Sequence, residues 1–165
     1  MGQAKPIPDG YHAVTPQLVL DDAAKAIRFY EQAFGAKEVM RMPGPGGKVW
    51  HAELQIGDSK IFLGDAMPGM GATPPSPEHP SSVSVMLYVP DADATFRRAL
   101  DAGARIEMDL QDMFWGDRGG SVVDPFGYRW FIATHVRDVS EDEMRRAGQE
   151  ALRKAEASMG SGAHT

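Results

Sequence analysis

The segment from Met113 to His135, MFWGDRGGSVVDPFGYRWFIATH, sets the expected architecture of the chain. Within it, Asp124-Pro125-Phe126-Gly127 has the composition of a tight turn, because proline presets φ at the second position and glycine tolerates a positive φ. Aromatic and β-branched residues fill 128–135, which is typical of a half-buried strand. We therefore expect an antiparallel hairpin whose two strands meet at this turn.

Two large apolar residues, Phe114 and Trp115, precede the tripeptide Gly116-Asp117-Arg118, which is turn-like and carries both charge signs. Apolar bulk beside a few polar groups is typical of the rim of a small-molecule pocket. A hydrophobic plug with a surface ion pair has the same composition. The loop is therefore interpreted either as a pocket rim or as simple packing.

The hydrophobic pattern on the N-terminal side predicts strand, helix and three strands. The strands are expected at 14–20, 37–42, 49–56 and 60–64, and the helix is expected to follow Asp21 and Asp22 and to end at Gly35. Its apolar stripe consists of Ala23, Ile27, Tyr30 and Phe34.

The same order recurs further along the chain. Strands are expected at 83–89, 105–110, 120–123 and 128–135, with a helix capped by Asp91 or Asp93 that buries Ala92, Phe96, Ala99 and Leu100. Val19 and Val89 are 70 residues apart, and Gly35 and Gly103 are 68 apart. The chain is thus predicted to be an internal repeat of one βαβββ unit.

These patterns predict one domain over 1–138 and a helical addition over 139–165. The two modules should span about 11–65 and 83–138, joined by a Gly-, Pro- and Ser-rich linker or lid over 66–82. Residues 1–10 are expected to be a loose arm. Ser140 and Glu143 form a capping box for a last helix that should run to about Ala157, lie on the surface or against a partner subunit, and be followed by a flexible tail.

Composition narrows the possible partners. Hydrophobic residues make up 42% of the chain and charged ones 24%, which is typical of a soluble globular protein. Because no basic cluster occurs and the net charge is −6, we expect no nucleic acid partner. No apolar run approaches membrane-spanning length, so we expect no membrane partner either, but a small molecule. The N-terminus lacks the apolar core of a signal peptide, which predicts a cytoplasmic location. The lack of cysteine excludes disulfides and thiolate metal sites.

Several short motifs occur in an order that is typical of one superfamily. They are Val14-Thr15-Pro16-Gln17-Leu18, Ile27-Arg28-Phe29-Tyr30, Phe34-Gly35-Ala36, His51-Ala52-Glu53-Leu54, Phe114-Trp115-Gly116-Asp117-Arg118 and Asp124-Pro125-Phe126-Gly127. With its paired βαβββ units, the chain resembles the vicinal oxygen chelate superfamily of glyoxalase I, bleomycin-resistance proteins, extradiol dioxygenases and fosfomycin-resistance enzymes, and within it the PhnB-like branch. The resemblance covers about Tyr11 to Asp138. It implies an α+β fold of two curved four-stranded sheets around a concave pocket, and a homodimer; it leaves open whether the pocket forms within one chain or across the dimer.

The resemblance also marks the positions where the superfamily's metalloenzymes hold a divalent ion. Those four inward positions fall on Thr15, Phe62, Val85 and Phe131. Positions two residues away on the same faces offer Gln17, Lys60, Gly64, Val83, Leu87, Arg129 and Ala133. Since none of these residues supplies an imidazole or a carboxylate, we expect no metal and no other cofactor.

His51, Glu53 and Gln55 alternate along the third predicted strand. In the architecture of the superfamily this strand is interior to its sheet, so its polar face should look into the cavity. A histidine and a carboxylate two residues apart on a strand point the same way and could act as a general base with its orienting group. The alternative is a hydrated polar face, or pairing with a lysine or arginine of a neighbouring strand.

The predicted function is therefore binding of a small organic ligand by a metal-free protein that sequesters or carries it. Ligand contacts are expected from Thr15, Gln17, Phe62, Val85, Trp115 and Phe131, with Asp117 and Arg118 at the mouth and His51 and Glu53 as candidate catalytic residues. Ten methionines would suit an adaptable apolar cavity. The alternative is a glyoxalase- or dioxygenase-like enzyme, either metal-dependent or using His51 and Glu53 as acid and base.

Overall fold

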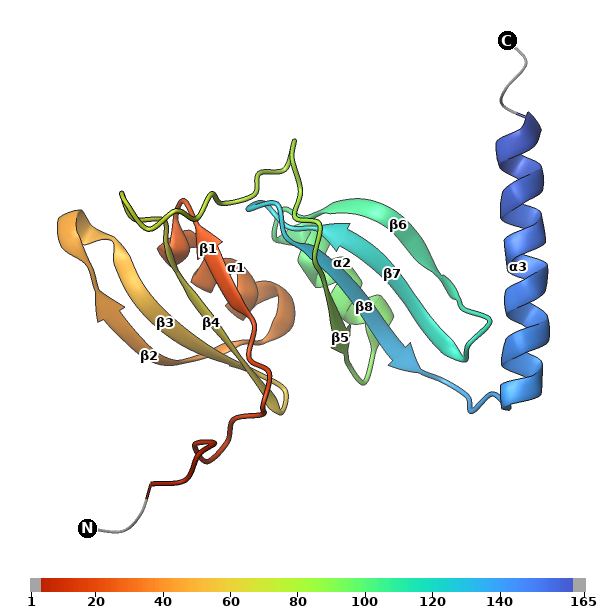
Figure 1. Cartoon of the computed structure of the whole chain (residues 1–165), viewed down its shortest axis with the longest axis horizontal. Coiled ribbons are helices and arrows are strands. Elements are labelled where there is room, and N and C mark those ends of the chain that lie inside the picture. The colour runs from red at the N-terminus through yellow and green to blue at the C-terminus, as the bar shows by residue number, and fades with distance from the viewer. Residues whose placement is uncertain (1–3, 162–165) are drawn as a thin grey trace.

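Each half of the chain folds into one helix and one four-stranded sheet, as Figure 1 shows for the computed structural model, which describes residues 4–161. Sheet A has the strand order β1-β4-β3-β2, and sheet B repeats it as β5-β8-β7-β6. In each sheet the first strand runs parallel to the last, and the other pairs are antiparallel. The expected α+β fold and internal repeat are confirmed.

The elements lie close to their predicted positions. The first half contains β1 (Gln17–Leu20), α1 (Ala23–Phe34), β2 (Lys37–Pro43), a short 3-10 turn (Pro45–Gly47), β3 (Val49–Ile56) and β4 (Ser59–Asp65). The second contains β5 (Ser84–Tyr88), α2 (Ala92–Asp101), β6 (Arg105–Asp112), β7 (Asp117–Val123) and β8 (Arg129–His135), followed by α3 (Glu141–Ser161). Residues 66–82, the predicted linker, form neither helix nor strand.

The caps of the two repeated helices are set by local sequence. The Asp22 carboxylate accepts a hydrogen bond from the Lys25 amide at 2.9 Å, and α1 ends at Gly35, whose φ is +67°. Asp91 caps α2 in the same way by accepting from the Ala94 amide at 2.9 Å. Asp93, the alternative cap, pairs with Arg118 instead.

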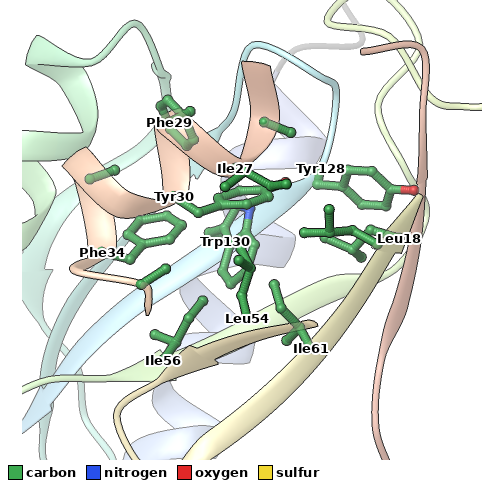
Figure 2. Close-up of a cluster of buried hydrophobic side chains, with 14 of the residues drawn as sticks. Leu18, Ile27, Phe29, Tyr30, Phe34, Leu54, Ile56, Ile61, Tyr128 and Trp130 are labelled. Carbon is green, nitrogen blue, oxygen red and sulfur yellow. The ribbon is translucent and has the colours of Figure 1, made fainter. Parts of the chain in front are cut away.

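One hydrophobic core joins the two halves. Helices α1 and α2 pack against each other, and Trp130 of β8 contacts Tyr30 and Phe34 of α1, with ring centroids 5.3 and 4.6 Å apart (Figure 2). The Tyr30 hydroxyl also donates to the Asp124 carboxylate at 2.8 Å. Each sheet therefore has a face packed on this core, and we call the opposite face its open face.

The predicted hairpin turn is confirmed. The buried Asp124 carboxylate accepts from the amides of Phe126 and Tyr128, both at 2.9 Å, and from Trp130 Nε1 at 2.9 Å. Burial is the main influence on its pKa and raises it. Gly127 has φ +88°, and an added Cβ would lie 2.5 Å from the Ser76 carbonyl of the linker. The turn thus holds β7 against β8 and the linker against both.

Two strands, β1 and β7, begin three residues away from their predicted starts at 14 and 120. Strand β1 begins at Gln17, so Val14 lies outside it and is 83% exposed. The turn expected at Gly116-Asp117-Arg118 is wrong, because β7 already begins at Asp117. The turn instead spans Met113 to Gly116, where the Gly116 amide donates to the Met113 carbonyl at 3.0 Å and Gly116 has φ +98°.

Helix α3 stands at one end of the molecule, beside sheet B (Figure 1). The Ser140 hydroxyl accepts from the Glu143 amide at 3.3 Å, but the Glu143 carboxylate pairs with Arg137 at 2.8 Å, so the capping box forms only in part. Residues 162–165 of the predicted tail lie outside the described residues. None of the described helices is long and apolar enough to cross a membrane.

Candidate functional site

The open face of sheet A gathers four of the predicted site residues. Strand β3 carries His51 and Glu53, and the strand register places Glu53 beside Phe62 of β4, and Phe62 beside Gln17 of β1. Residues that are paired across strands project to the same face. The rings of His51 and Phe62 lie 4.9 Å apart, edge to face. The site therefore forms from three strands of one sheet.

The N-terminal arm covers part of this face through Tyr11. Its hydroxyl donates a hydrogen bond to Glu53 Oε2, its ring lies edge-on to Phe62 at 5.9 Å, and the Lys60 ammonium lies 3.8 Å from the ring centroid. Tyr11 directly follows residues 1–10, for which a loose arm was expected. A cavity of about 430 Å³ lies between arm and sheet, lined by Pro6, Ile7, Pro8, Tyr11, His12, Ala13, Thr15, Glu53 and Phe62.

Glu53 is a buried carboxylate, with 9% of its surface exposed. The hydrogen bond from Tyr11 is the main cause that lowers its pKa, and it outweighs burial, which alone would raise it. His51 Nε2 lies 3.5 Å from Glu53 Oε1 and contributes in the same direction. Glu53 is therefore ionised at neutral pH and is a weak base.

A second cavity, of about 400 Å³, lies further along the same face. It is mainly apolar, and the start of the linker forms part of its wall. Its lining is Gln17, Leu18, Val19, Met42, Trp50, His51, Gly64, Asp65, Ala66, Met67, Met70 and Ala72. An added Cβ at Gly64 would lie 2.7 Å from the Trp50 carbonyl, so glycine is needed for the close approach of β3 and β4. Because His51 lines this cavity and Glu53 the first, the two cavities are neighbours.

Asp117, on the open face of sheet B, is the centre of a separate polar cluster. This carboxylate is 1% exposed and accepts from Trp115 Nε1 and His135 Nδ1, both at 2.8 Å, and from the Tyr88 hydroxyl at 2.9 Å. Burial favours the neutral acid, but the donors outweigh it and lower the pKa of Asp117. Asp117 in turn is the main cause that raises the pKa of His135. Asp117 is thus a buried structural acceptor, whereas we predicted it at the mouth of the pocket.

The other predicted residues of sheet B divide between its two faces. The Trp115 ring lies 6.3 Å from that of Phe131 on the open face. Val85 is in register with the buried Trp130 and packs on the core, so its neighbours Ser84 and Met86 occupy the open face. The prediction that Val85 points into the pocket was wrong by one residue. A shift of one residue along a strand exchanges its two faces.

Arg118 also lies away from the predicted mouth. Its guanidinium forms two hydrogen bonds of 2.7 Å with the Asp93 carboxylate of α2 and one of 3.2 Å with Asp112. Its register partner, Thr134, faces α2 as well, since the Thr134 hydroxyl accepts from the Ala92 amide at 2.8 Å. Arg118 therefore fixes α2 to sheet B on the face that bears the helix.

Most of the predicted residues form two sets, although Thr15 and Val85 also line a third cavity, of about 290 Å³, to which both modules contribute. Thr15, Gln17, His51, Glu53 and Phe62 surround the cavities of sheet A, whereas Trp115, Asp117 and Phe131 lie on sheet B. Among the described residues, no hydrogen bond, ion pair or ring contact links one set to the other. Met86 and Tyr88, on the open face of sheet B, are 50% and 59% exposed.

Tyr11 and Trp50 line these cavities but were not predicted as parts of the site from the sequence. Tyr11 contacts Glu53 across 42 positions of sequence, and nothing near Tyr11 signals that partner. The methionine count did suggest an adaptable cavity, but it could not indicate that Met42, Met67 and Met70 converge.

The divalent metal of the superfamily's enzymes does not fit the side chains present. Ser84, and not Val85, lies on the open face, so the four positions that hold the metal in those enzymes are Thr15, Phe62, Ser84 and Phe131 in this chain. None of these side chains is an imidazole or a carboxylate. Within the part of the chain that the structure describes, no group of three or more His, Asp or Glu side chains could hold a metal ion.

Comparison with known proteins agrees with this fold. Residues 11–132, well over half of the chain, match the family model of the Glyoxalase/Bleomycin resistance protein/Dioxygenase superfamily. An uncharacterized Mycobacterium tuberculosis protein, Rv0887c, is 47% identical over 139 residues, which cover 82% of this chain and 81% of that protein.

Solved structures extend the comparison. The Arabidopsis thaliana At5g48480 product has a TM-score of 0.62 at 28% identity, covering 74% of this chain and 98% of that one. The PhnB protein from Bacillus cereus has the same fold, with a TM-score of 0.60 at 19% identity, covering 74% of this chain and 99% of that one. On the family match, the chain belongs to the glyoxalase/bleomycin resistance protein/dioxygenase superfamily.

Proposed function

We propose that this protein binds a small organic molecule on the open face of sheet A, and that it sequesters or carries this ligand. The observation that supports the proposal is the pair of neighbouring cavities, one apolar and lined by methionines, the other containing Glu53. Apolar walls supply affinity and a few polar groups supply orientation. Methionine side chains adapt to ligands of varied shape.

An enzyme is the second candidate, because His51 and Glu53 lie 3.5 Å apart on the same face. In that case they would act as acid and base on a bound substrate. The lowered pKa of Glu53 makes it a poor proton acceptor at neutral pH, which favours binding over catalysis. A metal-dependent lyase or dioxygenase would need donors that the four inward positions lack.

The test is a thermal-shift screen of the full chain against small organic molecules, since any ligand of the native state raises the melting temperature. For each hit we expect Trp50→Ala, which removes a half-exposed cavity wall, to weaken binding by about tenfold or more. Leu152→Ala, an exposed position on α3, should leave the affinity unchanged. A hit that wild type converts to product, and that His51→Ala binds without converting, would decide for the enzyme.

We also propose that the protein is a homodimer located in the cytoplasm. Apolar side chains on the open faces support the dimer: Met40, Met42, Met86 and Tyr88 are 39–59% exposed in the single chain. Light scattering at micromolar concentration should give twice the chain mass of 17.9 kDa. A monomer mass would refute the dimer, and fractionation of the host cell would test the compartment.

A further inference from the structure

Glu53 differs from the other buried carboxylates in how few donors it has. Asp65 accepts from the amides of Ala23 and Val49 at 2.8 and 2.6 Å, and Asp117 accepts from three side chains. Asp124 accepts from two amides and two side chains. Glu53 accepts one close bond, from Tyr11, and His51 stands at 3.5 Å. Since a carboxylate offers about four acceptor positions, about half of those of Glu53 are unused.

Within residues 4–161, no lysine or arginine forms an ion pair with Glu53, although the charge of Lys60 acts on this carboxylate at longer range. Among the described residues, no lysine or arginine nitrogen lies within 4.0 Å of its carboxylate, and its ion-pair partner is His51. Lys60 contacts the face of the Tyr11 ring instead. A buried charge without a cationic partner is costly unless another group supplies the opposite charge. Glu53 also lines a cavity, so a ligand can reach it.

The walls beside Glu53 also suit a cation. The rings of Tyr11 and Phe62 line the same cavity, and aromatic faces attract ammonium groups, although Lys60 already occupies one face of the Tyr11 ring. The neighbouring cavity, lined by Met42, Met67 and Met70, would accept an apolar group attached to such a cation. The two cavities therefore match a molecule with a charged head and an apolar body.

We infer that the ligand is an amine in its cationic form with an apolar body, and that its ammonium group binds Glu53 beside Tyr11 and Phe62. The inference rests on the proposed binding function and names the ligand class of the same site. The apolar body lies along the open face of sheet A, toward His51 and the methionines.

Tryptamine and tryptophol test the inference because they share an indole-ethyl body and differ in an ammonium or a hydroxyl group. Isothermal titration calorimetry of the full chain near pH 7 should give tryptamine an affinity about tenfold higher than that of tryptophol. Glu53→Gln should abolish this preference and keep tryptophol binding, since glutamine still accepts from Tyr11. Glu107→Gln removes the same charge from a carboxylate already paired with Arg129 at 2.7 Å, and should keep the preference.

A wild-type measurement guards against misfolding of the variant. The Glu53 side-chain carboxyl ¹³C resonance should shift on addition of tryptamine and not of tryptophol. Equal affinities, or a preference that survives Glu53→Gln, would overturn the inference while leaving the proposed function intact. The inference alone would also be overturned if tryptamine does not bind while other molecules raise the melting temperature of the wild type but not that of Trp50→Ala. A screen without any ligand would overturn both.

Discussion

Two buried carboxylates, Glu53 and Asp117, are kept ionised by different means at the residue scale. Glu53 depends on the hydroxyl of Tyr11, whereas Asp117 has three side-chain donors from β5, β8 and the loop before β7. Because a ligand can replace one donor more easily than three, Glu53 is suited to binding and Asp117 to structure. Mutations that disturb Glu53 and Asp117 should therefore have different effects on stability.

Tyr11→Phe should reduce stability at neutral pH by about 1 kcal/mol through loss of the hydrogen bond to Glu53. The pKa of Glu53 is depressed in the folded state, so its stabilisation exists above its unfolded value of 4.5 and disappears as the pH falls through the folded value. The difference between wild type and variant in urea unfolding should therefore shrink below about pH 4.5. A difference that stays constant down to pH 3 would contradict this account.

Asp117→Asn should destabilise the fold by roughly 2 kcal/mol, because the amide NH₂ would face a donor in a buried site. The pKa of His135 should also fall toward its ordinary value of 6.5, since Asp117 is the main cause of its elevation. Urea unfolding and NMR titration of His135 measure the two effects. Asp112→Asn, at a side chain 78% exposed, is the control and should change stability by less than about 0.5 kcal/mol.

At the scale of elements, β1 is a four-residue edge strand that Tyr128 holds from outside its sheet. The Tyr128 hydroxyl accepts from the Val19 amide and donates to the Val19 carbonyl, both at 2.8 Å (Figure 2 shows this hydroxyl pointing toward β1). One side chain of the second module thus occupies the unpaired edge of the first. It supplies the bonds that a further strand would otherwise make.

Tyr128→Phe should speed hydrogen exchange of the Val19 amide and lower the stability by about 1–2 kcal/mol. The Phe62 amide, which donates to the Pro16 carbonyl at 2.8 Å, serves as an internal reference on the paired side of β1. Equal acceleration at both amides would indicate global destabilisation and not a local loss at the edge.

Gly57 and Gly127 both have a positive φ, but an added Cβ would clash with a neighbour only at Gly127. Replacing each by alanine therefore distinguishes the cost of backbone strain from the cost of a steric clash. Gly57→Ala meets nothing within 4 Å, so it should cost only the left-handed backbone penalty of about 1 kcal/mol. Gly127→Ala adds a clash with the Ser76 backbone at 2.5 Å and should cost about 3 kcal/mol or more. Similar losses for the two variants in urea unfolding would show that the linker does not hold the hairpin turn.

At the scale of the whole molecule, α1 and α2 lie within one core shared by both sheets, and α3 lies outside it (Figure 1). The Phe114 ring is close to α3: an added Cβ at Gly148 would lie 3.6 Å from it. This arrangement keeps α3 away from the open face of sheet A. The core and the candidate site are therefore built without α3.

Truncation after Asp138 should lower the unfolding free energy by less than about 1 kcal/mol and leave ligand affinity on sheet A unchanged. Urea unfolding of the two chains at equal concentration measures the first effect, and calorimetry the second. If α3 instead packs on a partner subunit, truncation will lower the mass in light scattering, and stability will depend on protein concentration.

The sequence by itself determined the caps of α1, the hairpin turn and the pattern of strands and helices whose recurrence gives the repeat and the α+β class, because each of these elements depends on residues within a few positions of one another. Asp22 and Gly35 bound α1 wherever it packs, and the turn from Asp124 to Gly127 is formed by local bonds, in which Asp124 accepts from the amides of Phe126 and Tyr128. Only the tertiary structure decided which face Val85 takes, that Asp117 is buried, and that Tyr11 contacts Glu53. A one-residue shift in strand register exchanges two faces, and a hydrogen bond across 42 positions leaves no local pattern, so neither can be read along the chain.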